Sequence, residues 1–526
     1  MNISSKKNYP SIFNDVIGPV MRGPSSSHCA AAVRIGLLVR DLMDGVIQDV
    51  LIEFDPNGSL ATTHESQGSD MGLFAGFLGW DVTDERMADS LKWIQEAGIR
   101  VNIQITPIDA KHPNTYKMTV RNKKETRAVT AISTGGGIIE LIDIDGIKVS
   151  ISGDYYETLI YFKSDSNQLL KHLSENISVD EIHLLHGETT QLIIIRSQCF
   201  FEPEFIANLR SQFEIQSIKQ LSPVLPILSR REVQIPFITC AEMLKYNHNK
   251  HLDLGELAIH YESERGAISQ DSVMRKMIDI IEVMQSSINA GLAGTKYSDR
   301  ILGYQSGNFR DQMDNRNLID AGVLNQIILY TTALMESKSS MGLIVAAPTA
   351  GACGGLPGAC IGVGKAMEFS NADMAKAMLA GGIIGIFISA HATFAAEVGG
   401  CQAECGAGSG MAAAALVTLA GGSTQQAVNA ASMALQNILG MICDPVAKRV
   451  EVPCLGKNVL AASNALACAN MALSDYDPVI PLDEVVETMD RVGKMLPSAL
   501  RCTGLGGLSI TKTSHDIESR LPGSHG

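Results

Sequence analysis

Residues 411–442 read MAAAALVTLAGGSTQQAVNAASMALQNILGMI, and this stretch decides how the C-terminal half of the chain folds. Ala, Leu, Met and Gln favour helices, and the many small side chains let neighbouring helices approach closely. The stretch therefore predicts two buried helices. The same Ala-, Gly- and Met-rich composition with helical periodicity extends over most of residues 236–526, without strand signals. We expect an all-helical domain there.

Three glycine clusters interrupt this helical region. They are PTAGACGGLPG (348–358), EVGGCQAECGAGSG (397–410) and CTGLGGL (502–508). Glycine is a poor interior helix former but allows close backbone approach. We therefore interpret the clusters as helix junctions where the backbone approaches a ligand or another helix.

The preceding chain predicts an α+β N-terminal part. Residues 46–54 (VIQDVLIEF) and 116–122 (YKMTVRN) read as strands, and residues 31–43 (AAVRIGLLVRDLM) as an amphipathic helix. We assign them to a first domain at 1–148.

Residues 149–222 predict a second module, in which strands and helices follow the order β-α-β-β-α-β. The strands are expected at 158–163, 179–186, 190–197 and 215–221, and the helices at 167–175 and 203–213. This is the order of the ferredoxin-like unit, which small regulatory ACT domains share. An interdomain or dimerisation module and an effector site are both compatible with it. LSPVLPILSR (221–230) reads as a linker.

Composition and charge exclude several classes of protein. The 526 residues have a formal net charge of −14, which argues against nucleic-acid binding. Residues 1–10 are polar and lack a signal-peptide core, and the 11 cysteines are an odd number, so we expect a cytoplasmic protein with free thiols. Residues 377–396 carry no Asp, Glu, Lys or Arg, but Ser389, His391 and several glycines favour a buried helix over a membrane span.

The cysteines of the helical region form a candidate metal site. Cys401 and Cys405 lie in one glycine-rich segment, and Cys443 and Cys454 bracket the irregular segment CDPVAKRVEVPC. No CxxC pair is present, so zinc-knuckle and ferredoxin signatures do not fit. By spacing alone, thiols that fill an Ala-rich core are favoured over a metal site.

Four motifs in order resemble the iron–sulfur-dependent L-serine dehydratases: GPSSSH (23–28), APTAGACG (347–354), CDPVA…VPC (443–454) and GLGGL (504–508). The similarity covers almost the whole chain. It implies a β-type N-terminal domain, an ACT-like module and a helical α-type catalytic domain. It also implies a [4Fe–4S] cluster held by Cys401, Cys443 and Cys454, with one iron left open. Some members place a C-terminal cysteine on that iron, whereas the last cysteine of this chain is Cys502.

The chain departs from the family pattern at two places. Where the family commonly has Gly-His-Gly-Thr-Asp, this chain has THESQGSD (63–70), which puts Gln67 at the position of the proposed catalytic histidine. We therefore expect His64 or His28 to be the base. An extra glycine precedes Cys401, which makes Cys405 a competing ligand.

The implied reaction dehydrates and deaminates L-serine to pyruvate and ammonia. It needs a base for the Cα proton, a Lewis acid for the β-hydroxyl and a site for the carboxylate. Ser25, Ser26 and Ser27 are candidates for the carboxylate, although they also suit an ordinary helix N-cap. Further candidates that could contact the substrate are Thr349, Lys457 and Asn458.

Several alternatives remain open at this stage. Threonine, cysteine or another β-substituted or hydroxylated amino acid could replace serine, and the chain could instead be a non-catalytic amino-acid sensor. A pyridoxal-phosphate enzyme is disfavoured because Lys296 has no recognisable Schiff-base setting. A transporter is disfavoured by the 19% charged residues. We expect a homodimer that binds a small amino acid and no nucleic acid or membrane.

Overall fold

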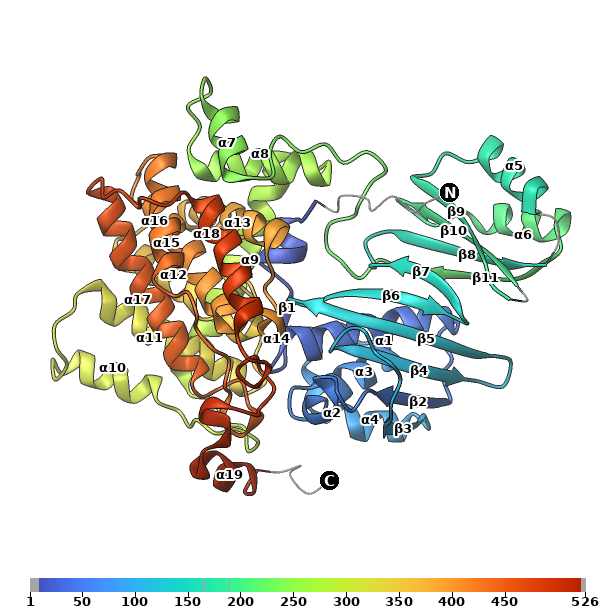
Figure 1. Ribbon diagram of the computed structural model, residues 1–526, viewed down its shortest axis with the longest axis horizontal. Helices are drawn as coiled ribbons and strands as arrows, with labels where there is room; N and C mark the ends of the chain where they lie inside the picture. Colours follow the sequence, from blue (N-terminus) through green and yellow to red (C-terminus); the bar gives the residue numbers. More distant parts are fainter. Residues whose placement is uncertain (1–8, 164–165, 189, 522–526) are drawn as a thin grey trace.

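A six-stranded mixed sheet forms the core of the N-terminal part (Figure 1). The computed structural model describes residues 9–163, 166–188 and 190–521, so most of the polar start and the last five residues lie outside the described residues. The strand order is β3-β2-β4-β5-β6-β7, with β2 and β3 parallel and the other pairs antiparallel. The strands are β2 (Asp49–Phe54), β3 (Arg100–Ile105), β4 (Thr115–Arg121), β5 (Thr126–Gly135), β6 (Ile138–Ile144) and β7 (Ile147–Ile151). Both strands expected in this part are confirmed.

Two helices cover this sheet and pack against each other. They are α1 (Ala31–Leu42) and α3 (Ser69–Leu78), and the short helices α2 (Leu60–Thr63) and α4 (Ser90–Glu96) accompany them. In β2 the side chains alternate between half-buried and buried, and the buried ones join the apolar side of α1 in one core. A Cβ atom on Gly76 would lie 2.7 Å from the Cα of Gly36, so these two glycines let the helices touch.

The second sheet has four antiparallel strands in the order β11-β8-β10-β9. Its elements are β8 (Tyr156–Phe162), α5 (Ser166–Asn176), β9 (Glu181–His186), β10 (Gln191–Ser197), α6 (Pro203–Gln212) and β11 (Ile215–Leu221). The predicted β-α-β-β-α-β order is confirmed, and the strand order is that of a ferredoxin-like unit. Helices α5 and α6 lie on one face of this sheet (Figure 1) and share an apolar core with it.

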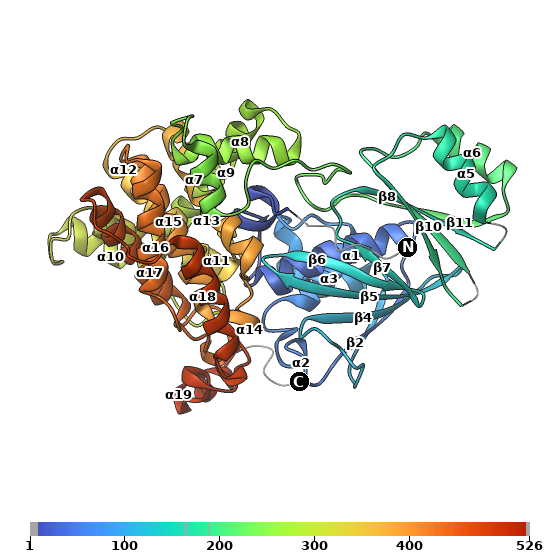
Figure 2. The ribbon, with the colours of Figure 1, turned by 45° about the horizontal axis from the view of Figure 1, so that its top comes forward.

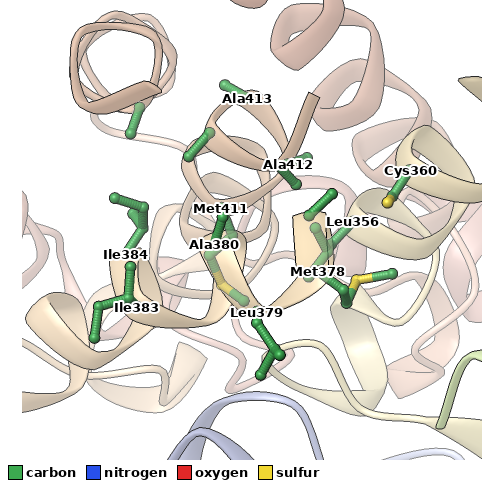
Figure 3. Packing of buried hydrophobic residues seen from close by; sticks show 14 of the residues in the cluster. Leu356, Cys360, Met378, Leu379, Ala380, Ile383, Ile384, Met411, Ala412 and Ala413 are labelled. Atoms are coloured by element: carbon green, nitrogen blue, oxygen red, sulfur yellow. The ribbon is translucent and has the colours of Figure 1, made fainter. Parts of the chain in front are cut away.

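The C-terminal part is largely helical, as predicted. Its helices are α7 (Cys240–Asn247), α8 (Leu254–Gly266), α9 (Gln270–Ala293), α10 (Ser306–Asp314), α11 (Val323–Ser339), α12 (Gly355–Ala366), α13 (Asn371–His391), α14 (Ala396–Gly399), α15 (Ala407–Leu419), α16 (Thr424–Gln436), α17 (Cys454–Leu473), α18 (Leu482–Met495) and α19 (Lys512–Glu518). Figure 3 shows Met411 of α15 beside Ala380 of α13, with Leu356 and Cys360 of α12 nearby. A Cβ atom on Gly381 would lie 2.8 Å from the carbonyl oxygen of Met411, which explains the glycines in this core.

Helix α13 is central to this core. Among the described residues it is the one helix long and apolar enough to cross a bilayer. However, most of its apolar length is buried inside the protein, which agrees with the expected core helix.

The N-terminal segment crosses into the helical part before the first sheet begins. Its π-helical turn, Ile12–Val16, packs on α13, where Cβ atoms on Gly382 and Gly385 would clash with Ile12 and Val16. Next, β1 (Val20–Met21) pairs antiparallel with β12 (Ile344–Val345). The all-helical prediction therefore missed one short strand. In addition, the boundary expected at residue 148 falls inside β7.

The two parts also meet at α14 (Figure 2). A Cβ atom on Gly135, at the end of β5, would lie 3.1 Å from the Cβ of Ala395, next to the start of α14. Glycine-rich segments of the helical part therefore lie against the end of the first sheet.

Candidate active site

Five buried cysteines lie close together in the helical part, near its contact with the N-terminal part. We call them the thiol cluster: Cys401, Cys405, Cys443, Cys454 and Cys502. All five side chains are buried and none forms a disulfide. The thiol of Cys443 is a hydrogen-bond partner of the thiols of Cys401 and Cys502, and these contacts, with burial, raise its pKa well above the ordinary value. Burial and the nearby Cys401 thiol raise the pKa of Cys454 as well. The three cysteines implied as ligands therefore lie in one buried group.

A short backbone pairing positions Cys443 and Cys502. Cys443 forms an isolated parallel bridge with Arg501, and the N–H of Cys502 donates to the carbonyl oxygen of Cys443 at 3.0 Å. Next along the chain, Asp444 Oδ2 accepts the backbone N–H of Leu508 at 3.0 Å. A Cβ atom on Gly507 would lie 2.6 Å from the Cβ of Asp444. The motifs CDPV and GLGGL therefore fit against each other, and the second needs its glycine.

Two lysines supply positive charge beside the thiols. The ammonium of Lys457 donates to the carbonyl oxygen of Ile442 at 2.7 Å and to Asp444 Oδ1 at 2.8 Å, and it lies 3.8 Å from the sulfur of Cys401. Burial alone would lower the pKa of Lys457, but the Cys401 thiol and the Asp444 carboxylate raise it above the ordinary value. Lys338, which is 1% exposed, donates to the carbonyl oxygen of Val450, in the segment between Cys443 and Cys454.

Two carboxyl groups face this region from the segment that holds Cys401. A carboxylate oxygen of Glu404 lies within 4.8 Å of the sulfurs of Cys401 and Cys443, which makes these three residues a candidate metal site. Burial raises the pKa of Glu404 to about 7. Glu397 instead accepts a hydrogen bond from the hydroxyl of Ser27 at 3.0 Å and lies 3.8 Å from Nδ1 of His28.

The three serines of the GPSSSH motif lie on the N-terminal side of the same site. The hydroxyls of Ser25 and Ser27 lie 3.2 and 3.0 Å from Nδ1 of His28, while Ser26 Oγ accepts the backbone N–H of Ala350 at 3.2 Å. Ser25 precedes the π-helical turn that leads into α1, but its side chain makes no capping hydrogen bond. The serines therefore connect the two parts of the chain instead of capping the helix.

The two candidate histidines differ in how their ring nitrogens are used. His28 is fully buried, its Nε2 lies 3.0 Å from the hydroxyl of Thr63, and burial lowers its pKa. His64 Nδ1 lies 2.8 Å from both oxygens of Asp70, and within the described part of the chain its Nε2 has no hydrogen-bond partner. Burial alone would lower the pKa of His64, but the hydrogen bond and charge of Asp70 raise it above the ordinary value.

Gln67, which stands where the resemblance implies a histidine, points at the thiol cluster. Its side chain is 1% exposed, and its Nε2 lies 3.9 Å from the sulfur of Cys502. An amide nitrogen cannot take a proton from carbon, but it can donate a hydrogen bond.

The remaining candidates hold backbone in place. Thr349 Oγ1 donates to Glu404 at 2.7 Å and accepts the N–H of Ala352 at 3.2 Å. Asn458 is fully buried, and its Oδ1 accepts the N–H groups of Gly354 and Gly355 at 3.0 and 2.9 Å. Its Nδ2 donates to the carbonyl oxygen of Cys454 at 2.9 Å and lies 3.6 Å from the sulfur of Cys405. Asn458 therefore orders the backbone around the thiols.

This set of donors suits an iron–sulfur group. Thiolates are the usual protein ligands of such clusters, and these cysteines sit at loop and helix ends instead of in separate helix interiors. The nearby ammonium of Lys457 offsets the negative charge that thiolates bring. Sequence reasoning missed Glu397 and Glu404. Their signal was their spacing, four residues before and three after Cys401, about one helical turn in each direction.

Comparisons with known proteins point in one direction. The family described as serine dehydratase alpha chain matches residues 249–509. A probable L-serine dehydratase alpha chain of Bacillus subtilis (strain 168) is 33% identical over 287 residues, which cover 55% of this chain and 96% of that protein. The L-serine dehydratase alpha chain of Peptoniphilus asaccharolyticus is 34% identical over 281 residues, covering 53% and 96%. L-serine dehydratase 2 of Escherichia coli (strain K12) is 26% identical over 502 residues, covering 93% and 96%.

Proposed function

This chain belongs to the L-serine dehydratase family, and on that premise we propose that it is a lyase that converts L-serine to pyruvate and ammonia. The observation that carries the proposal is the meeting of two half-sites. The thiol cluster comes from the helical part, and the serines, His28, His64 and Gln67 come from the N-terminal part.

We assign Cys401, Cys443 and Cys454 as ligands of a [4Fe–4S] cluster with one open iron. The mutual contacts of their buried thiols and the nearby Lys457 support this choice. When bound, such a cluster supplies a Lewis acid that makes the β-hydroxyl of the substrate a better leaving group. Cys405 is held by the amide of Asn458, and we do not assign it as a ligand.

His64 is the base in this proposal. Asp70 binds Nδ1, which fixes the tautomer that leaves Nε2 free to accept the Cα proton. His28 uses both ring nitrogens in hydrogen bonds, and so we assign it a positioning role for Ser25, Ser27 and Thr63.

The substrate carboxylate is bound by hydroxyl donors where the two parts meet. Ser25, Ser26 and Ser27 provide the hydroxyls. Ser26 Oγ already accepts the N–H of Ala350 in the Thr349 turn, which leaves its hydroxyl hydrogen for the carboxylate. Holding the carboxylate here would orient the Cα–H bond toward the base. Asn458 supports this site by ordering the turn at Gly354 and Gly355.

The wider organisation completes the proposal. We divide the chain into a β-type domain, an ACT-like ferredoxin-type module up to residue 222 and an α-type catalytic domain at 236–526. The boundary between the first two, expected at 148/149, is moved to the end of β7 at Ile151. The element order and sheet order of the second module support that assignment. We further propose a cytoplasmic homodimer.

Anaerobic purification followed by iron and sulfide analysis and a substrate panel tests the function. Pyruvate from L-serine supports it, whereas 2-oxobutyrate from threonine or sulfide from cysteine as the dominant product would assign a different substrate.

Cys401→Ser, Cys443→Ser and Cys454→Ser should each lose iron, and Cys468→Ser is the matched control because Cys468 is buried against Asn464 instead of the cluster. Wild-type protein that contains no iron and has no lyase activity would instead support the alternative of a non-catalytic amino-acid sensor.

A further inference from the structure

Glu404 stands apart from the other acidic groups of the site. Its carboxylate lies within 4.8 Å of two of the proposed ligand sulfurs, Cys401 and Cys443. It belongs to a π-helical turn, Gln402–Gly406, and such turns are frequent at functional sites. No role for this carboxyl group follows from the mechanism above.

The surroundings of Glu404 hold one oxygen and leave the other free. Oε1 accepts the hydroxyl hydrogen of Thr349 at 2.7 Å. Within the described part of the chain, Oε2 has no hydrogen-bond partner. A Cβ atom on Gly351 would lie 3.0 Å from Oε1 and 3.2 Å from Oε2, so the carboxyl group lies directly on the backbone of the TAGACGG turn.

Glu397, the other carboxylate near Cys401, has different hydrogen-bond partners. Glu397 is bound by Ser27 and lies near His28, so it belongs to the N-terminal half of the site. Within the described residues Oε2 of Glu397 also lacks a hydrogen-bond partner, so the distinguishing feature of Glu404 is that its carboxylate lies within 4.8 Å of the sulfurs of Cys401 and Cys443.

We propose that Glu404 is a catalytic residue that protonates the leaving hydroxyl group through Oε2. This inference rests on the proposed function, which has a Lewis acid for the leaving group, and adds a proton donor to it. His64 Nε2 takes the Cα proton, and the electron pair of the C–H bond becomes the second bond between Cα and Cβ. The Cβ–O bond breaks with its electron pair on oxygen, and the Glu404 proton converts the departing group to water. The products are 2-aminoacrylate and water, and the enamine then tautomerises and hydrolyses to pyruvate and ammonia. The proton on His64 passes through solvent to restore Glu404.

A leaving-group comparison tests this role. Glu404→Gln retains the size of the side chain and an acceptor for Thr349, but it cannot donate an acidic proton. The wild type and the variant are compared on L-serine and on β-chloro-L-alanine, because chloride leaves without being protonated. We expect kcat for L-serine to fall by roughly 100-fold or more, the scale of general acid catalysis. Elimination of chloride should stay within about threefold of wild type.

Two further measurements separate this role from a structural one. Iron and sulfide per chain should match wild type, and L-serine should still perturb the cluster absorbance of the variant, which reports binding without turnover. Loss of iron would overturn the proposal in favour of a ligand role. Equal loss of both activities with an intact cluster would overturn it in favour of a packing role, and unchanged serine turnover would refute it outright. Failure of the proposed function would appear in the wild type instead, as no turnover of either substrate.

Discussion

The side-chain nitrogen of Gln67 lies 3.9 Å from the sulfur of Cys502, so residues 435 positions apart close one edge of the thiol cluster. Cys502 contacts Cys443, whereas Cys443 contacts both Cys401 and Cys502. The edge position of Cys502 and the central position of Cys443 predict different effects of removing each thiol.

Cys502→Ser should keep the iron and sulfide content of wild type, because the three proposed ligands remain. Cys443→Ser should lose most of its iron under the same anaerobic conditions. Metal analysis and the visible spectrum of both variants check this. Equal iron loss in the two proteins would make Cys502 a ligand and contradict the assignment made above.

Lys457 should control how firmly the cluster is held. Lys457→Met removes the cation next to Cys401 and leaves the Asp444 carboxylate, 6% exposed, without its partner. Breaking such a pair destabilises a protein by about 3 kcal/mol, so iron should pass to a chelator faster and unfolding should need less denaturant. Lys457→Arg is the charge-conserving control and should lie closer to wild type. Identical iron-release rates for wild type and the methionine variant would show that the cation does not matter.

The His64–Asp70 pair makes a prediction about pH. Because Asp70 raises the pKa of His64, a base at His64 becomes active only as pH rises through a value above the ordinary 6.5. Asp70→Asn should move the rising limb of the kcat/KM profile to lower pH and reduce its plateau. The same pKa shift affects stability. Because the pKa of His64 is higher in the folded state, protonated His64 stabilises the fold at pH values below its ordinary pKa, and this stabilisation is lost as pH rises through the folded-state pKa.

Denaturation of the Asp70→Asn variant checks that sign directly. Its loss of stability relative to wild type should be about 1–2 kcal/mol at about pH 5.5 and smaller at about pH 8. A larger loss at the higher pH would contradict the assigned direction of the shift. His64→Gln should remove the rising limb and leave the iron content unchanged.

Lys219 joins the two sheets and provides a stability prediction far from the active site. Its side chain, 3% exposed, binds Asp44 at 2.7 Å and Glu125 at 2.5 Å, and both partners lie outside its own module. Lys219→Met should lower the free energy of unfolding by about 2–3 kcal/mol, since one partner is solvent-exposed and the other half-buried. Lys92→Met, at an exposed pair on α4, should change it by less than about 0.5 kcal/mol. Equal effects of the two substitutions would show that Lys219 does not couple the sheets.

Much of the fold followed from local patterns in the sequence. Alternation in residues 46–54 and the β-α-β-β-α-β order of the second module gave the correct elements, because each pattern reflects which face of its own segment is buried. The pairing of β1 with β12 could not be predicted. Each strand has two residues, and their partnership depends on how distant elements pack.

The candidate site was predicted more by motif than by geometry. The motifs named the cysteines, the serines and His28, which the structure brings together. They did not show that Glu404 faces the thiols whereas Glu397 faces Ser27, because a position three or four residues from Cys401 in sequence does not determine the direction of a side chain. They also left His28 and His64 as equal candidates. The difference lies in which ring nitrogens already have partners, and that depends on three-dimensional contacts.

The crossing of the N-terminal segment into the helical part has a consequence for biosynthesis. The ribosome releases Ile12 and Val16 long before it makes α13, on which they pack. These apolar side chains precede both sheets in the chain, and they lack the helix on which they pack until α13 has been made. Completing the helical core therefore requires a long-range chain closure, which is the kind of step that slows folding and leaves apolar surface open to aggregation.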